Sequence, residues 1–166
     1  NLSVRQFYDL NLVNKIRSAI DNTHFDPLFL ELEITETAMM YDTDRALRIV
    51  HELKEMGVKI ALDDFGTGYS SLYYLKRFPI DILKIDRTFI DGIPDDENDG
   101  NIVSGILSMA KQMQLHVVAE GVETGQQLSF LQEHDCVEAQ GFLFSKPVAA
   151  EEFTPMLSER KLLKVS

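Results

Sequence analysis

The sequence predicts an α/β fold: a parallel sheet covered by helices, forming part of a (β/α) barrel. Apolar runs of strand length alternate with segments of helical periodicity along the whole chain. The connections between them are short, and no low-complexity linker interrupts them. Such alternation is typical of parallel sheets with helical crossovers. The 166 residues, 45% of them hydrophobic, favour a single domain over residues 1–166.

The first third of the chain supplies a strand end, a helix, a strand and a second helix. The opening letters NLS, from Asn1, read as the end of a strand whose beginning is missing. Apolar residues at helical spacing predict a helix over about 10–22. After Pro27, residues 28–34 alternate apolar and acidic positions and predict a strand. A helix over about 43–56 follows, with Thr43 as its expected N-cap.

Residues 59–72, KIALDDFGTGYSSL, read as strand, loop and helix start. Two adjacent aspartates stand where the apolar run ends, directly before a glycine-rich turn. Packing gives no reason for this pair, so Asp63 and Asp64 are the first candidates for chemistry.

The remaining chain continues the alternation. Its acidic, turn-rich segment 93–101 is expected to be a surface loop leading to a helix that carries Val103 to Met113. Thr124 is expected to cap a later helix, and the tail from Ala149 is helix-prone, with Pro155 near its first turn. The predicted strands of this part are 81–86, 116–120 and 137–144.

Polar residues fall at or near the ends of these strands: Asn1, Glu33, Asp63, Asp64, Lys84, Glu120 and Gln140. An open, doubly wound sheet gathers its ligand groups at one switch point and commonly carries a phosphate-binding glycine fingerprint, which is absent here. In a barrel, all strand ends converge on one mouth. A full barrel has eight strands and about 250 residues, so this chain is expected to hold about six strands, with two upstream of Asn1.

Composition excludes several classes of function. A formal charge of −11 argues against a groove for long nucleic acid. The single cysteine, Cys136, excludes an internal disulfide and a Cys-rich zinc site, and fits a reducing cytoplasm. No apolar run reaches membrane-spanning length, so no membrane contact is expected from this segment. Whether the parent protein is membrane-anchored is not decided by these residues.

The acids at the strand ends predict a site for divalent cations. Carboxylates are the ligands that magnesium and manganese prefer. Converging acids would otherwise raise one another's pKa, and cations remove that conflict. Two ions about 3.5–4 Å apart suit in-line attack on a phosphodiester. Lys84 would orient the attacking water or neutralise developing charge.

Each candidate also has a structural interpretation. An Asp-Asp pair before glycine is often a turn with a helix cap. Glu33 could be solvated or salt-bridged, and Lys84 could be a surface lysine. Gln140 could form hydrogen bonds to backbone groups in a turn. Phe142 and its aromatic neighbours could be packing residues or could stack on a base. The shared position at strand ends favours a site.

Six ordered motifs resemble the EAL-domain family of cyclic di-GMP phosphodiesterases. They are NLS from Asn1, ELEITE from Glu31, DDFGTGYSSL from Asp63, LKID from Leu83, VVAEGVET from Val117 and QGFLFSKP from Gln140. The resemblance implies a TIM-like barrel that hydrolyses cyclic di-GMP to linear pGpG with two magnesium or manganese ions.

The resemblance also implies residue roles. Asn1, Glu33 and Asp63 would bind one metal, and Asp63, Asp64 and Glu120 the second. Lys84, Glu120 and Gln140 would serve the catalytic water. Substrate contacts are implied for Asp86 and for Phe142, where many members carry tyrosine. Glu36, with Glu123 as helper, would anchor the DFG loop.

The glutamate that gives the family its name, and an arginine near it, are not in this chain. Both are expected upstream of Asn1, so the fragment alone is expected to be inactive while its parent is an active enzyme. A catalytically silent cyclic di-GMP-binding effector or protein-interaction module is the alternative. The family also implies a homodimer formed through the DFG loop region.

Overall fold

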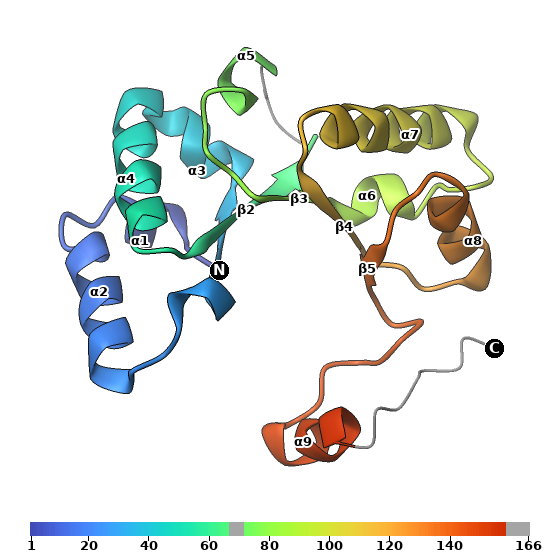
Figure 1. Ribbon diagram of the computed structural model, residues 1–166. Helices are drawn as coiled ribbons and strands as arrows, with labels where there is room; N and C mark the ends of the chain where they lie inside the picture. The colour runs from blue at the N-terminus through green and yellow to red at the C-terminus, as the bar shows by residue number, and fades with distance from the viewer. Residues whose placement is uncertain (67–71, 159–166) are drawn as a thin grey trace.

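The computed structural model describes residues 1–66 and 72–158 and contains one parallel sheet in these residues (Figure 1). Strands that are consecutive in the sequence are neighbours in the sheet, in the order β1-β2-β3-β4-β5. This order contains no reversal point, unlike a doubly wound sheet. The strands are β1 (Glu31–Thr35), β2 (Lys59–Phe65), β3 (Ile82–Ile85), β4 (His116–Glu120) and β5 (Glu138–Gln140).

Helices connect the strands and continue beyond the last of them. In the described residues they are α1 (Val4–Phe7), α2 (Leu12–Thr23), the 3-10 helix η1 (Pro27–Phe29), α3 (Glu36–Tyr41), α4 (Thr43–Glu55), α5 (Leu72–Leu75), α6 (Arg87–Ile90), α7 (Glu97–Gln112), α8 (Gly125–Glu133) and α9 (Ala150–Ser158). None of those helices combines the length and apolar character needed to cross a bilayer.

The sheet has one apolar face and one polar face, as the alternation of side chains along each strand dictates. Ile34, Leu62 and Leu83 are at most 2% exposed and belong to one core cluster with residues of α4 and α7. Figure 1 shows α4, α7 and α8 arranged around the outside of the sheet. Glu33 and Lys84 occupy the alternate positions of their strands and lie on the opposite face of the sheet. Helices on one face and polar groups on the other fit a barrel wall.

The sheet is curved, with the polar face on its concave side. The Nζ of Lys84 in β3 lies 2.6 Å from Glu33 Oε1 of β1 and 2.6 Å from Glu120 Oε1 of β4. In a flat sheet β1 and β4 would be about 14 Å apart, at roughly 4.8 Å per strand. Curvature therefore brings their polar side chains toward each other, although hydrogen bonds among the described strands do not close a barrel.

A sixth strand position is present as a single bridge. Leu2 pairs in parallel with Ile34, and its N–H donates to the carbonyl of Glu33 at 2.8 Å. The expected strand end at NLS is therefore present, and it places Asn1 beside Glu33 in register. Five strands and this bridge make up the expected six positions.

Several predicted boundaries were wrong because local caps decide them. The strand expected from residue 28 begins at Glu31, because Asp26 accepts from the Leu28 N–H at 3.0 Å and starts η1. The N-cap of α4 is Asp42, not Thr43. Asp96 accepts from two backbone N–H groups, so α7 begins inside the segment expected to be a loop.

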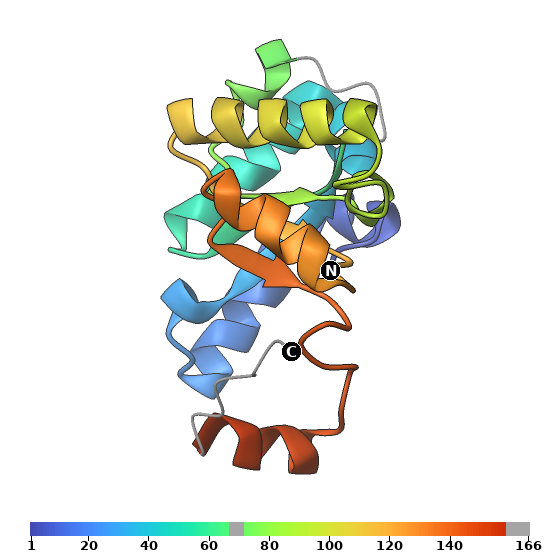
Figure 2. The same cartoon turned by 90° about the vertical axis from the view of Figure 1, so that its right-hand side faces the viewer.

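The end of the chain also differs from expectation. The strand predicted over 137–144 stops at Gln140, because the Leu143 N–H donates to the carbonyl of Val122 and the chain turns. Pro155 lies inside α9 rather than near its first turn. Figure 2 shows α9 apart from the sheet, at the end opposite α7. The Thr124 cap of α8 was predicted correctly.

Candidate functional site

The side chain of Lys84 is the centre of the polar face. It projects from β3 and is 4% exposed. Its Nζ lies 2.6 Å from Glu33 Oε1 on β1 and 2.6 Å from Glu120 Oε1 on β4. Asp63 Oδ1 on β2 is 3.8 Å away. Four neighbouring strands thus bring one cation and three carboxylates together.

The pKa values of the groups in this cluster depend strongly on one another. Burial lowers the pKa of Lys84, but hydrogen bonds to Glu120 and Glu33 outweigh it and raise the pKa above its ordinary value. Burial raises the pKa of Glu120, and Lys84 partly opposes that shift. Burial and the neighbouring Asp63 raise the pKa of Asp64. One ammonium is therefore too little charge to balance the acids around it.

A β-bulge places both aspartates opposite Lys84 in the register of β2 and β3. Leu62 pairs with Leu83 and Phe65 with Ile85, so two residues of β2 oppose one residue of β3. Asp64 takes the left-handed conformation, with φ 56°, and its N–H donates to Asp63 Oδ1 at 3.0 Å. In a regular strand, adjacent side chains point to opposite faces. The extra residue removes that conflict and returns Phe65 to the core.

Glu36 lies directly behind this bulge. It is the first residue of α3, is 1% exposed, and accepts from the Gly66 N–H at 3.1 Å through Oε2. Its Oε1 is buried and has no hydrogen-bond partner in the described part of the chain. The rest of the DFG loop, residues 67–71, lies outside the described residues. Glu36 is thus placed to hold the start of that loop.

Glu123, expected to help at the loop, has a different described partner. Its Oε1 lies 3.0 Å from Nη1 of Arg87, which is the first residue of α6. Asp86 caps α6 by accepting from the N–H and hydroxyl of Thr88, at 2.9 Å and 2.6 Å. Its carboxylate is still close enough to Asp64 to raise the pKa of that residue.

Gln140 and Phe142 lie at the end of β5. Gln140 pairs in register with Glu120, and its carbonyl accepts from the Val122 N–H at 3.0 Å. Phe142 is 53% exposed, with Lys146 Nζ 5.8 Å from its ring centre. Both residues line a cavity of about 410 Å³ beside α9. The Phe142 ring is therefore about half exposed, with the ammonium of Lys146 near one of its faces.

Of the sequence candidates, the structure gathers Glu33, Asp63, Lys84 and Glu120 at one point, with Asp64 beside them. Register places Asn1 and Gln140 at the edges of this cluster. Sequence reasoning missed Arg87 and Gln127, which hold the loop after Glu120. Gly121, which has φ 75°, was the available signal that this loop needs a special backbone.

The cluster has the donor chemistry of a site for divalent cations but not yet its geometry. In the described part of the chain, no three His, Cys, Asp or Glu side chains are already arranged around a metal position. The carboxylates close on Lys84 instead. The donors are nevertheless hard oxygens with excess negative charge, and their chemistry fits a hard divalent cation.

Comparisons with known proteins show what this chain is similar to. The family model of the EAL domain matches residues 1–147. The cyclic di-GMP phosphodiesterase NbdA of Pseudomonas aeruginosa is 50% identical over 146 residues, which are 86% of this chain and 19% of NbdA. The chain thus spans about a fifth of the length of that curated relative.

Two solved structures extend the comparison. The PaMucR phosphodiesterase in complex with c-di-GMP has a TM-score of 0.89 and 47% identity, over 92% of this chain and 62% of that one. A manganese and c-di-GMP complex of BlrP1 from Klebsiella pneumoniae has a TM-score of 0.79 and 32% identity, over 86% of this chain and 36% of that one.

Proposed function

Because this chain belongs to the EAL domain family, we propose that its parent protein is a metal-dependent phosphodiesterase that hydrolyses cyclic di-GMP to linear pGpG. The observation that carries the proposal is the convergence of Glu33, Asp63 and Glu120 on Lys84. The c-di-GMP bound to PaMucR and the manganese bound to BlrP1 support the substrate and the metal.

Two divalent cations, magnesium or manganese, are proposed to bind at this cluster. Asn1, Glu33 and Asp63 would hold one, and Asp63, Asp64 and Glu120 the other. The ions would supply charge neutralisation and activate water for attack on phosphorus. The bulge supports the arrangement, since it gives two successive carboxylates to one face of the sheet.

Lys84 is proposed to orient the attacking water. In this structure its ammonium neutralises part of the charge of the surrounding acids. Cations would take over that neutralisation, leaving Lys84 free to hold the water and face the phosphate. Glu120, whose pKa is raised by burial, is suited to accept the water's proton. Gln140, its neighbour in register, would complete the hydrogen bonding of the water.

Substrate recognition is assigned to the edge of the same mouth. The half-exposed ring of Phe142 would stack on a guanine, and Asp86 would contact the substrate from the start of α6. Glu36 would keep the DFG loop in place through Gly66. Glu123 would support the neighbouring loop through Arg87.

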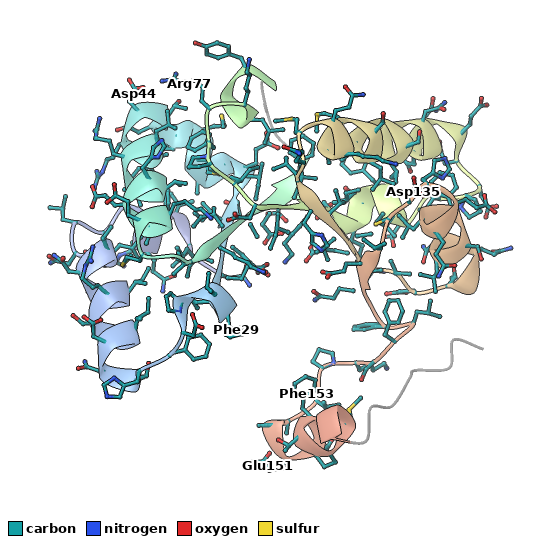
Figure 3. The ribbon with its side chains drawn as sticks, in the orientation of Figure 1. Phe29, Asp44, Arg77, Asp135, Glu151 and Phe153 are labelled. Atoms are coloured by element: carbon teal, nitrogen blue, oxygen red, sulfur yellow. The ribbon has the colours of Figure 1, made fainter. Side chains whose placement is uncertain are left out.

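We also propose a homodimer formed through the DFG loop region, and a cytoplasmic location for this domain. Support comes from α5, which follows the loop: Tyr73 is 66% exposed there. Arg77, just beyond α5, lies 3.8 Å from Asp44 of α4, and Figure 3 shows the two residues side by side. This contact places the region after the loop beside α4.

The test uses the purified full-length parent with magnesium or manganese. Chromatography of the products should show conversion of cyclic di-GMP to pGpG, and chelation of the metal should abolish it. Tight binding of cyclic di-GMP without turnover would reject the proposal in favour of a silent effector. Absence of both binding and turnover would reject it in favour of an interaction module.

A further inference from the structure

The four-residue helix α6 lies between the two loops that follow the acids of β2 and β4. One of its contacts reaches the loop after Asp63 and Asp64. A Cβ at Gly66, which has φ 96°, would be 2.8 Å from Cε2 of Phe89. The same glycine donates its N–H to Glu36. Gly66 is therefore held between a carboxylate and the face of α6.

The opposite end of α6 reaches the loop after Glu120. The stem of Arg87 packs on Gly121, where a Cβ would be 2.8 Å from the Arg87 Cβ. The guanidinium of Arg87 pairs with Glu123. Gly121 directly follows Glu120, so α6 contacts the backbone next to that carboxylate.

A buried glutamine joins the same loop to the last residue of α6. Gln127 of α8 is 5% exposed. Its Nε2 donates to the carbonyl of Ile90 at 3.0 Å. Its Oε1 accepts from the N–H groups of Glu123 and Thr124, at 2.8 Å and 2.9 Å. The side-chain amide of Gln127 thus donates a hydrogen bond to α6 and accepts hydrogen bonds from the loop after Glu120.

We propose that α6 is a rigid link that sets the position of Glu120 relative to Asp63 and Asp64, with Phe89 and Gln127 as positioning residues. The inference rests on the proposed function, since it assigns these acids to one reaction. β2 and β4 are not neighbours in the sheet, because β3 lies between them. Pairing through β3 connects the two strands, and the backbone that follows each acid is held in addition by a contact with α6.

The first test replaces Gln127 with glutamate in the full-length parent. Gln127→Glu keeps an acceptor for the two loop N–H groups, as in an ordinary capping box. It replaces the donor to the Ile90 carbonyl by a carboxylate oxygen that repels this carbonyl, so it breaks the link at a single point. Gln126→Glu is the matched control, because Gln126 is the adjacent exposed glutamine of α8.

Hydrogen exchange at Gly66 is the deciding measurement. Gln127→Glu should speed exchange of this amide about fivefold, as expected for the weakening of one hydrogen-bonded contact, while Gln126→Glu should leave it unchanged. A purely structural role would speed exchange in α8 and residues 121–124 but not at Gly66, and that result would overturn the proposal.

Kinetics supply the second readout. Gln127→Glu should lower kcat for cyclic di-GMP about fivefold and leave KM unchanged, since it misplaces a group that acts on the reacting water. A parent without phosphodiesterase activity would reject the proposed function. The exchange result at Gly66 would still decide whether the link exists.

A reciprocal variant covers the case in which Gln127→Glu does not fold. Phe89→Leu keeps apolar volume at α6 but removes the flat ring from Gly66. It should speed exchange at the N–H groups of Glu123 and Thr124, which lie on the far side of α6. Unchanged exchange at both amides would overturn the link.

Discussion

At the scale of single residues, the cluster depends on one buried ammonium. Replacing Lys84 by methionine leaves Glu33, Asp63 and Glu120 together without their cation. Removing one partner of a buried ion pair costs about 3 kcal/mol. The free energy of unfolding of the metal-free parent should fall by about this amount at neutral pH, measured by urea denaturation with a chelator.

The control for that variant is Lys15→Met. Lys15 also pairs with an acid, Asp9, but its side chain is 66% exposed. Exposed pairs contribute little, because water screens both charges. An equal loss of stability in the two variants would contradict the central role assigned to Lys84.

Asp64 gives a prediction about pH. Burial and Asp63 raise its pKa in the folded protein, so folding favours the protonated form. The stability from this group is present below its unfolded pKa and is lost as pH rises through the raised folded value. Asp64→Asn should therefore stabilise the metal-free parent at pH 7.5 but not at acid pH.

Thermal denaturation at several pH values, with a chelator, checks this prediction. Asp21→Asn, at an exposed position of α2, is the control and should leave the pH dependence unchanged. If the stability of Asp64→Asn depended on pH in the same way as that of the unsubstituted parent, the folded protein would not raise the pKa of Asp64, and the prediction would be wrong.

At the scale of elements, the junction between β2 and the DFG loop requires a left-handed backbone and close contact with α6. Gly66→Ala would strain φ and place its Cβ 2.8 Å from Phe89 Cε2. Such strain costs about 1–3 kcal/mol. We expect a loss of unfolding free energy in that range, measured by urea denaturation, together with faster exchange of the residue 66 amide.

Gly105→Ala is the matched control, with the opposite expected sign. Gly105 lies inside α7, and an added Cβ would meet nothing within 4 Å. Alanine in an exposed helix interior is more favourable than glycine by up to about 1 kcal/mol. A stabilising Gly66→Ala substitution would contradict the proposed junction.

At the scale of the whole molecule, the curved sheet collects acids from separate strands, so cation binding should stabilise the fold as a unit. Manganese at about 100 times its dissociation constant should add about 2.7 kcal/mol to the unfolding free energy of the parent. Calorimetry with and without manganese measures this gain. Glu33→Gln should reduce it, whereas Glu52→Gln, on the exposed surface of α4, should not.

The sequence by itself determined the parallel α/β architecture and most of the acidic cluster. Both follow from local patterns: alternation of strand and helix, and polar residues where apolar runs end. Caps moved the starts of β1, α4 and α7 by one to a few residues, since an aspartate side chain and the nearest free N–H groups decide where a helix begins.

Only the tertiary structure decided how these residues meet. The bulge that places Asp63 and Asp64 on one face depends on the register between β2 and β3. Lys84 joins β1 to β4 because the sheet is curved. The pairing of Glu123 with Arg87 depends on how α6 lies beside the next loop. Register, curvature and packing are relations between distant segments, so no local pattern in the chain encodes them.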